Sequence, residues 1–177
     1  AVCYGSCSPC APSLSTPSVT TTMAQSITTT SASLGGDVTS DGGATVTENG
    51  VIYSTSPAPY TSADTVTMSS GTGSFNLVIS GLTPSTTYYY LAYATNSEGT
   101  AYGTEMSFTT ATPATSATVT TTSASSVTTT SALLGGEVTS DGGAAVTARG
   151  VVYSTSQNPD LTDDATTNGT GTGVFSS

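Results

Sequence analysis

The stretch LGGDVTSDGGATVTENGVIY, residues 34–53, decides how this chain is organised, because it returns as LGGEVTSDGGAAVTARGVVY at residues 134–153. Between residues 26–56 and 126–156, 24 of 31 positions are identical and no gap is needed. A repeat close to one domain length indicates one folding unit written twice in tandem, not a short-period solenoid.

The composition of the 177 residues favours an all-β fold. Thr, Val and nine Tyr suit a half-buried pleated surface, while 19 Gly together with Ser and Asp supply turns. Charged residues make up only 7% of the chain, unlike the charge-rich sequences of disordered proteins. A mucin-like Thr/Ser stalk is the rival interpretation, but such stalks lack regular apolar alternation.

The charge balance excludes whole classes of partner. The formal net charge is −10, and Arg149 is the only basic residue. Nucleic acids are bound through cationic groups that displace phosphate counterions, so we expect no nucleic-acid partner. No run of about 18 apolar residues occurs, and we expect no membrane insertion. We predict an extracellular or cell-surface location, with any export signal already removed or lying upstream.

Strand periodicity begins at residue 18. Alternate residues from Ala32 to Val38 share one face of a predicted strand. The sequence SDGG at residues 40–43 predicts a hairpin whose turn is capped by the side chain of Asp41, as Asp141 does in the second copy. A bulge is expected at Gly50.

The sharpest local pattern is GLTPSTTYYYLAYATN, residues 81–96. Leu82, Pro84 and Tyr88 fall at even spacings, and alternate residues of the strand that follows face inward. We expect a loop over residues 96–103 and a last strand over residues 104–110.

This pattern resembles the corner before the sixth strand of fibronectin type III domains, in which the hydroxyl of a Tyr, here Tyr88, bonds back to upstream backbone. With about seven strands expected over residues 18–111, it predicts tandem immunoglobulin-like, fibronectin type III-like β-sandwiches, the second one incomplete. Fibronectin type III domains carry a buried Trp on their second strand, and this chain has none. We expect Tyr53 or Phe75 to fill that space.

The sequences of the repeats are also similar to those of tandem repeats in very large secreted surface proteins of Bacteroidota, including gliding adhesins. In those proteins such units are spacers or stalks. The motifs that carry this resemblance are VTSDGGAxVTxxGVxYST, GLTPSTTYY and AYATNSEGTAYG.

Three segments are predicted: a Cys- and Pro-rich linker or cap at residues 1–17, a first sandwich at 18–111, and a linker with a partial second sandwich at 112–177. The second copy has no counterpart of residues 76–110. Either this sequence is part of a longer chain, or a strand from another molecule completes the second sandwich. In the second case, the Thr-rich N-terminal segment is one candidate donor.

The residue types argue against an enzyme. His and Lys are absent, so the usual pairs of nucleophile and base cannot be assembled. No cofactor is expected. Three closely spaced carboxylates, Asp160, Asp163 and Asp164, are the calcium candidates, and a solvated acidic loop is the favoured alternative. Cys3, Cys7 and Cys10 favour a disulfide-tied turn with one thiol left over, and a bond to a partner outside this chain is the alternative.

Surface contacts and modifications have their own candidates. Tyr89, Tyr93 and Tyr102 are candidates for contacts with a domain or a glycan. Thr65, within Asp-Thr-Val, matches the O-glycosylation pattern that the Bacteroidota resemblance makes relevant, and Asn168 begins an Asn-Gly-Thr sequon.

We therefore expect a non-catalytic structural repeat of an extracellular bacterial surface fibre, filament or adhesin stalk. Its partners would be neighbouring repeats or identical subunits, joined end to end through strand complementation in one version of this hypothesis. The alternative function is an accessory module, either a spacer or a carbohydrate-binding domain for surface glycans, of a secreted glycan-degrading enzyme.

Overall fold

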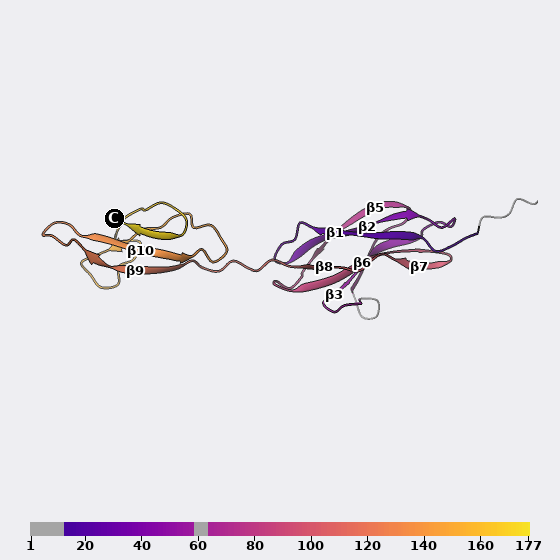
Figure 1. Cartoon of the computed structure of the whole chain (residues 1–177), viewed down its shortest axis with the longest axis horizontal. Helices are drawn as coiled ribbons and strands as arrows, with labels where there is room; N and C mark the ends of the chain where they lie inside the picture. The colour runs from indigo at the N-terminus through magenta and orange to yellow at the C-terminus, as the bar shows by residue number, and fades with distance from the viewer. Residues whose placement is uncertain (1–12, 59–63) are drawn as a thin grey trace, which may run out of the picture. The chain divides into compact units, whose positions relative to one another are not determined.

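A computed structural model describes residues 13–58 and 64–177 of the chain (Figure 1). The chain divides into two compact units, Ala1–Thr112 (unit 1) and Pro113–Ser177 (unit 2). All regular elements in the described ranges are β-strands, so none of these residues forms a helix long and apolar enough to cross a membrane.

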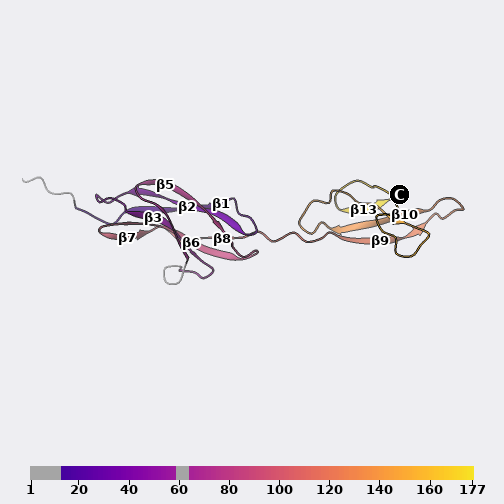
Figure 2. The same cartoon turned by 180° about the vertical axis from the view of Figure 1, so that it is seen from behind.

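Unit 1 is a sandwich of two antiparallel sheets (Figure 1; Figure 2). The first sheet has the order β1-β2-β5, built from β1 (Ser18–Gln25), β2 (Ser31–Ser40) and β5 (Gly73–Ser80). The second has the order β4-β3-β6-β7 with β8 also on β6, built from β3 (Glu48–Ser54), β4 (Asp64–Ser69), β6 (Thr87–Asn96), β7 (Gly99–Tyr102) and β8 (Met106–Thr109).

The core of unit 1 lies between these sheets and follows the predicted alternation. Alternate residues of β2 and β6 face inward, so that Leu34 and Ala92 are fully buried and Tyr90 is 1% exposed. The core cluster draws on β2, β3, β5, β6 and β8. This arrangement confirms the predicted fold class, an immunoglobulin-like sandwich of the fibronectin type III kind.

An aromatic ring packs over a glycine of β2. A Cβ built on Gly36 would lie 3.0 Å from the Phe75 ring and would overlap the Ala92 side chain and the Thr20 carbonyl oxygen. Of the two residues expected to fill this space, Phe75 lies directly over the second strand, and Tyr53 packs beside Tyr88 with ring centroids 6.3 Å apart.

The first sheet is hydrogen-bonded to the second along the β1 side. Thr21 is 7% exposed, and its hydroxyl accepts a hydrogen bond from the Ala92 N–H at 3.1 Å. The Gly103 N–H donates to the Ala92 carbonyl at 2.8 Å, and a Cβ on Gly103 would overlap the Thr21 hydroxyl. Glycine at position 103 therefore allows β1 to approach the edge formed by β7 and β8.

The predicted hairpin at residues 40–43 is wrong. The strands on either side of this turn belong to different sheets, because β2 pairs with β1 and β5 while β3 pairs with β4 and β6. The turn chemistry is nevertheless present: Asp41 Oδ1 accepts a hydrogen bond from the Gly43 N–H at 2.9 Å, and Gly42 and Gly43 have positive φ. The turn is a corner between sheets.

The predicted loop over residues 96–103 is also wrong. Residues 99–102 form β7, in which Tyr102 pairs with Tyr93. Both β7 and β8 pair with β6, but the register shifts by one residue between them, so that Met106 of β8 pairs with Tyr90. The last strand is thus divided by an irregular segment, residues 103–105, and the described part of unit 1 contains eight strands. The expected bulge at Gly50 is confirmed by a register shift between Asn49 and Gly50.

Unit 2 repeats only part of this framework. Its larger sheet has the order β9-β10-β13, built from β9 (Thr118–Ser125), β10 (Leu133–Ser140) and β13 (Gly173–Ser176), which Figure 2 labels. Its smaller sheet pairs β11 (Val152–Tyr153) with β12 (Asp164–Ala165). The described residues of unit 2 contain no strand corresponding to β6, β7 or β8.

Candidate functional site

The corner before β6 has the geometry that the fibronectin type III resemblance implies. The Tyr88 hydroxyl accepts a hydrogen bond from the Thr83 N–H at 3.0 Å, and its ring stacks on Phe108 with centroids 5.6 Å apart. Leu82, just before Thr83, is buried, and Pro84, just after it, is half-buried. These contacts fix the chain as it enters β6.

A buried threonine that the sequence did not single out closes the same corner. The Thr110 hydroxyl donates to the Thr83 carbonyl at 2.7 Å and accepts from the Thr86 N–H at 2.9 Å. Thr110 is only 2% exposed. No local pattern distinguishes Thr110 from the many exposed threonines, because its partners lie more than 20 positions away in the sequence.

The tyrosines predicted to form an outer surface do not share one exposed face. Tyr89 is half-buried and Tyr102 is 48% exposed, but Tyr93 is only 4% exposed, and its prediction as a surface contact is wrong. The reason is a glycine opposite: Gly50 pairs with Tyr93, and a Cβ on Gly50 would lie 2.9 Å from the Tyr93 ring. The ring therefore lies flat over the sheet.

The Tyr93 hydroxyl belongs to a three-residue polar cluster. It donates to Glu48 Oε1 at 2.5 Å, and the Thr67 hydroxyl contacts both groups at 3.0 Å. The bond from Tyr93, followed by that from Thr67, lowers the pKa of Glu48. Burial, followed by the bond to Glu48, raises the pKa of Tyr93. The cluster joins the neighbouring strands β3, β4 and β6.

The aspartates predicted to cap a turn or to bind calcium make mainly local hydrogen bonds. Asp141 accepts a hydrogen bond from the Gly143 N–H at 2.9 Å, which repeats the Asp41 cap. Asp160 accepts bonds from the Thr162 hydroxyl and from the Thr162 N–H, and these bonds, the hydroxyl first, lower its pKa. Asp163 accepts from the Asp160 N–H. Within the described ranges no group of three or more His, Cys, Asp or Glu is placed to hold a metal ion, so the structure does not gather Asp160, Asp163 and Asp164 into a ligand set.

The modification candidates differ in accessibility. Thr65 lies exposed on β4, at one edge of its sheet. The Asn168 side-chain amide donates to the Ser176 carbonyl at 2.6 Å, and its oxygen accepts from the Thr166 and Ser177 hydroxyls at 2.8 Å. A glycan on Asn168 would replace one of the two hydrogens of this hydrogen-bonded amide. The disulfide predicted among Cys3, Cys7 and Cys10 lies outside the described residues.

The largest departure from a closed sandwich is in unit 2. We call the residues Val119, Leu134, Val151 and Tyr153 its open inner face. Val119 is 60% exposed and Tyr153 is 46% exposed, while Leu134 and Val151 are half-buried. In unit 1 the equivalent Leu34 and Val51 are fully buried.

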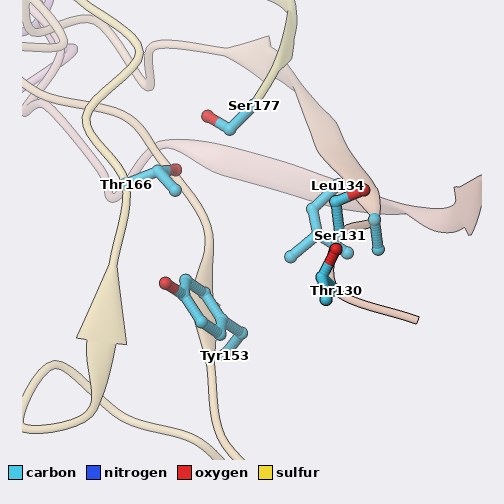
Figure 3. A pocket seen from close by; sticks show the side chains of 7 residues that line it. Thr130, Ser131, Leu134, Tyr153, Thr166 and Ser177 are labelled. Carbon is cyan, nitrogen blue, oxygen red and sulfur yellow. The ribbon is translucent and has the colours of Figure 1, made fainter. Parts of the chain in front are cut away.

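Two cavities interrupt the open inner face. One, of about 410 Å³, has Leu134 on one side and Tyr153 on the other, with Thr130 and Ser131 beside Leu134 (Figure 3). The other, of about 400 Å³, is lined by Val119, Thr121, Val151 and Phe175 among others. Both are mainly apolar and contain no pair of titratable groups suited to acid–base chemistry. Their arrangement can bind apolar side chains and is not suited to catalysis.

Arg149, the only basic residue, makes several hydrogen bonds to the segment of unit 2 that leads into β13. Its guanidinium donates to the carbonyl oxygens of Asn168 at 3.1 Å and Thr172 at 2.8 Å, with further bonds to the neighbouring glycines. It also lies 5.6 Å from the centroid of the Phe175 ring. In unit 1 the side chain of the equivalent Asn49 makes two bonds to the matching segment: its amide donates to the Gly71 carbonyl at 3.2 Å, and its oxygen accepts from the Ser69 hydroxyl at 3.1 Å.

No family model matches the sequence, and no curated protein matches it. Among solved structures, the sensor domain of the anti-sigma factor RsgI4 of Pseudobacteroides cellulosolvens is similar, at 21% identity and TM-score 0.46, over 57% of this chain and 100% of that domain. The third fibronectin III domain of human KIAA0343 matches at 16% identity and TM-score 0.38, over 64% of this chain and 97% of that one. Domains A168–A170 of titin match at 17% identity and TM-score 0.38, over 55% of this chain and 32% of the titin chain.

Proposed function

We propose that this chain is a non-catalytic structural repeat of an extracellular or cell-surface fibre, filament or adhesin stalk, of the kind found in large secreted proteins of Bacteroidota. The observation that carries the proposal is the shortness of the link between the two repeated units. A stalk works by holding successive domains at a defined spacing, which a long flexible linker would not do.

The link is anchored at both ends by backbone hydrogen bonds. The Ala111 N–H donates to the Thr28 carbonyl in unit 1 at 2.9 Å, and the Thr115 N–H donates to the Gly142 carbonyl in unit 2 at 2.8 Å. Only residues 112–114 lie between these anchors. Four consecutive Cα–Cα steps span at most about 14 Å. Pro113 fixes its own φ and restricts the residue before it, which further limits the conformations of the link.

The same anchor occurs at the start of unit 1. The Ser15 N–H donates to the Gly42 carbonyl at 2.9 Å, which repeats the Thr115–Gly142 bond one hundred positions earlier. Each unit therefore binds the segment that enters it in the same way. In a longer array of such units, this feature would give every junction the same short link.

The surface chemistry is consistent with a role outside the cell. A net charge of −10 with one basic residue leaves no cationic patch for nucleic acid, and one Arg with no Lys offers trypsin-like proteases a single site. The guanidinium of that Arg is bound to carbonyl oxygens. Thr65, on an exposed edge strand, is the position at which O-glycosylation would be accommodated most easily.

The structure favours the stalk over a glycan-binding accessory module. A stacking platform would need aromatic rings exposed together on one face. Tyr93 is instead buried over Gly50, and its hydroxyl is bound to Glu48. Tyr89 is half-buried and Tyr102 is exposed, so without Tyr93 these residues do not form a continuous exposed aromatic surface.

The proposal is tested by lengthening the link. Spin labels on Glu98→Cys and Thr139→Cys, with the three native cysteines replaced by serine, report the distribution of distances between the units by pulsed electron resonance. We expect a narrow distribution in the native sequence and a clearly broader one after insertion of Gly-Ser-Gly-Ser between Thr112 and Pro113. Equal widths in the two proteins would show that the native link imposes no spacing, and the stalk proposal would fail.

A further inference from the structure

The strand β5 of unit 1 has one open side. It pairs with β2 along its other side, and within the described residues β2 is its only strand neighbour (Figure 1; Figure 2). This side is open although both sheets of unit 1 are formed and the core between them is buried. Along such an edge, alternate backbone N–H and C=O groups have no strand partner and are a template for pairing with another strand.

The other edges of unit 1 carry features that prevent such pairing, namely bulges, charges and interruptions. The edge strand β1 has two register shifts, and the Thr21 side chain ties it to β6. The edge strand β4 begins with the exposed Asp64 and lies opposite the register shift at Gly50. The edge formed by β7 and β8 is interrupted at residues 103–105, a segment that includes Glu105.

The β5 edge has none of these features. Eight consecutive residues of β5 pair with β2 without a register shift. The strand contains no charged residue and no Pro. It is therefore the straightest and least protected edge in the described part of unit 1.

The charges of unit 1 lie away from this edge. The strands β1, β2 and β5 contain one charged residue, Asp37, whose carboxylate accepts a hydrogen bond from the Ser74 hydroxyl at 3.1 Å. Unit 1 has no Lys, Arg or His that could offset an acid. The remaining acidic residues lie in the corner after β2, on the second sheet or in its turns: Asp41, Glu48, Asp64, Glu98 and Glu105. Two copies that met through the second sheet would bring like charges together, whereas two β5 edges would not.

The outward side chains of β5 are compatible with a close neighbour. They are small and uncharged, and all four are exposed: Ser74, Asn76, Val78 and Ser80. Asn76 Oδ1 accepts a hydrogen bond from the Ser33 hydroxyl at 2.7 Å, so this side chain is held on its own sheet. Val78 is 76% exposed, and a strand added beside β5 would bury part of this apolar surface.

We propose that the open edge of β5 pairs with the same edge of a second copy of this chain, antiparallel and across a two-fold axis. Identical edges are self-complementary in this arrangement, because the two strands run in opposite directions. A second copy fits better than a charged foreign strand, because the edge offers no charge with which such a strand could pair. The inference goes beyond the stalk role, since lateral pairing does not depend on the spacing that the link imposes.

The first test measures the mass of the chain in solution. One edge of eight residues buries less surface than a stable dimer needs, so we expect association only at about 0.1–1 mM. In sedimentation equilibrium the average mass should rise with concentration from 17.3 kDa toward twice that value. A reductant is present throughout, so that no disulfide through Cys3, Cys7 or Cys10 can join two chains.

Hydrogen–deuterium exchange locates the contact. Between about 10 µM and about 1 mM chain, exchange should slow at least about tenfold at every second amide of residues 73–80, namely those that do not bond to β2. The amides of residues 64–69, on the edge strand of the other sheet, should not change.

Substitutions at two equally exposed positions of the same sheet separate edge pairing from a general effect of charge. Val78→Lys places like charges near the two-fold axis and should weaken association at least about tenfold. Met23→Lys is the matched control, because Met23 is also 76% exposed but lies on β1 at the opposite edge of the sheet, and it should associate like the native chain. Val78→Thr keeps a β-branched, uncharged side chain and should retain association.

Three results would overturn the proposal. A mass that stays at 17.3 kDa up to about 1 mM would show that the edge does not pair. Association that persists unchanged in Val78→Lys would place the contact elsewhere. Protection confined to residues 64–69 or to unit 2 would show that two copies meet through another surface. None of these results alters the distances measured between the units of one chain, so failure of edge pairing and failure of the stalk proposal are distinguishable.

Discussion

Units 1 and 2 place nearly the same residues in different surroundings. Val51 and Val151 follow the same Gly and precede almost the same sequence, yet Val51 is fully buried and Val151 is only half-buried. The strand around Val51 runs from Glu48 to Ser54, whereas its counterpart is reduced to Val152–Tyr153. Since the local sequence is so similar, the difference comes from the strand on either side: β3 lies between β4 and β6, and β11 pairs with β12 alone.

The comparison also shows which part of the fold depends least on β6. Val138 and Phe175 remain 4% and 7% exposed, much like Val38 and Phe75. They are covered within unit 2 itself, Phe175 by the Arg149 guanidinium. The sheet β9-β10-β13 is therefore the framework of the repeat, while the inner edge of β11 depends on a neighbouring strand.

Truncation of the equivalent leucine in each unit should give the largest difference between the units in lost free energy of unfolding. Leu34→Ala should destabilise unit 1 by about 2–5 kcal/mol, because it leaves a cavity in a closed core. Leu134→Ala should cost unit 2 about 1 kcal/mol, because the side chain is already half-exposed. Hydrogen exchange at increasing urea concentrations follows each unit separately. Equal losses would contradict the difference in packing.

Removal of Arg149 should have the next largest effect, and only on unit 2. Arg149→Met keeps a long apolar stem but loses the bonds to the carbonyls of Asn168 and Thr172 and the contact with Phe175, which should cost about 2 kcal/mol. Arg149→Lys keeps the charge without the planar group, so the stability of unit 2 in this variant should lie between that of the native chain and that of Arg149→Met. A silent Arg149→Met, measured by the same exchange experiment, would show that the carbonyl contacts do not stabilise the unit.

Loss of the corner hydroxyl should affect unit 1 to a smaller degree. Tyr88→Phe removes the acceptor for the Thr83 N–H and should destabilise unit 1 by about 1–2 kcal/mol in urea unfolding. Tyr153→Phe is the control, since Tyr153 is 46% exposed, and its effect should stay within about 0.5 kcal/mol. Equal effects of the two changes would mean that the corner bond contributes nothing.

The smallest expected effect is the contribution of Glu48 to the acid stability of unit 1. Hydrogen bonds from Tyr93 and Thr67 lower the pKa of Glu48 in the folded state. Glu48 therefore stabilises unit 1 above its unfolded pKa of about 4.3, and this contribution disappears as the pH falls through the folded value. Glu48→Gln should flatten the fall in thermal stability of unit 1 between about pH 5 and pH 3 by less than about 1 kcal/mol.

Unit 2 serves as the internal control for that measurement, because Ala148 occupies the position equivalent to Glu48. Its acid response should be the same in the native chain and in Glu48→Gln. If the variant changed the acid response of both units equally, the effect would not arise from the cluster with Tyr93.

Local patterns were sufficient to predict the fold class and the inward face of β6. Period-two alternation and the spacing of Leu82, Pro84 and Tyr88 carry that information within a few residues. The turn at residues 41–43 shows the limit, since Asp and Gly favour a tight turn whether the next strand joins the same sheet or crosses to the other. Pairing partners are a property of the whole sandwich.

The outer face of the second sheet could not be predicted from β6 alone. Alternation places Tyr93 outward, but its burial depends on Gly50, which lies opposite it on another strand. A glycine facing an aromatic residue is recognisable only once the register is known. Buried polar residues such as Thr21 and Thr110 escape prediction for the same reason, because their hydrogen-bond partners are distant in the sequence.

The most direct test of the central claim compares two equivalent amides in one sample. Hydrogen exchange at Ile52 and Val152 reports whether a strand covers the inner edge of each unit, since Ile52 pairs with Leu91 of β6, while the neighbouring Val151 N–H donates to Thr166 on the β12 side. We expect the Ile52 amide to exchange at least about a hundredfold more slowly, because β3 opens only with the core of unit 1 while β11 is open along one edge. Equal protection of the two amides in the isolated 177-residue chain would show that unit 2 is closed, and would contradict the account.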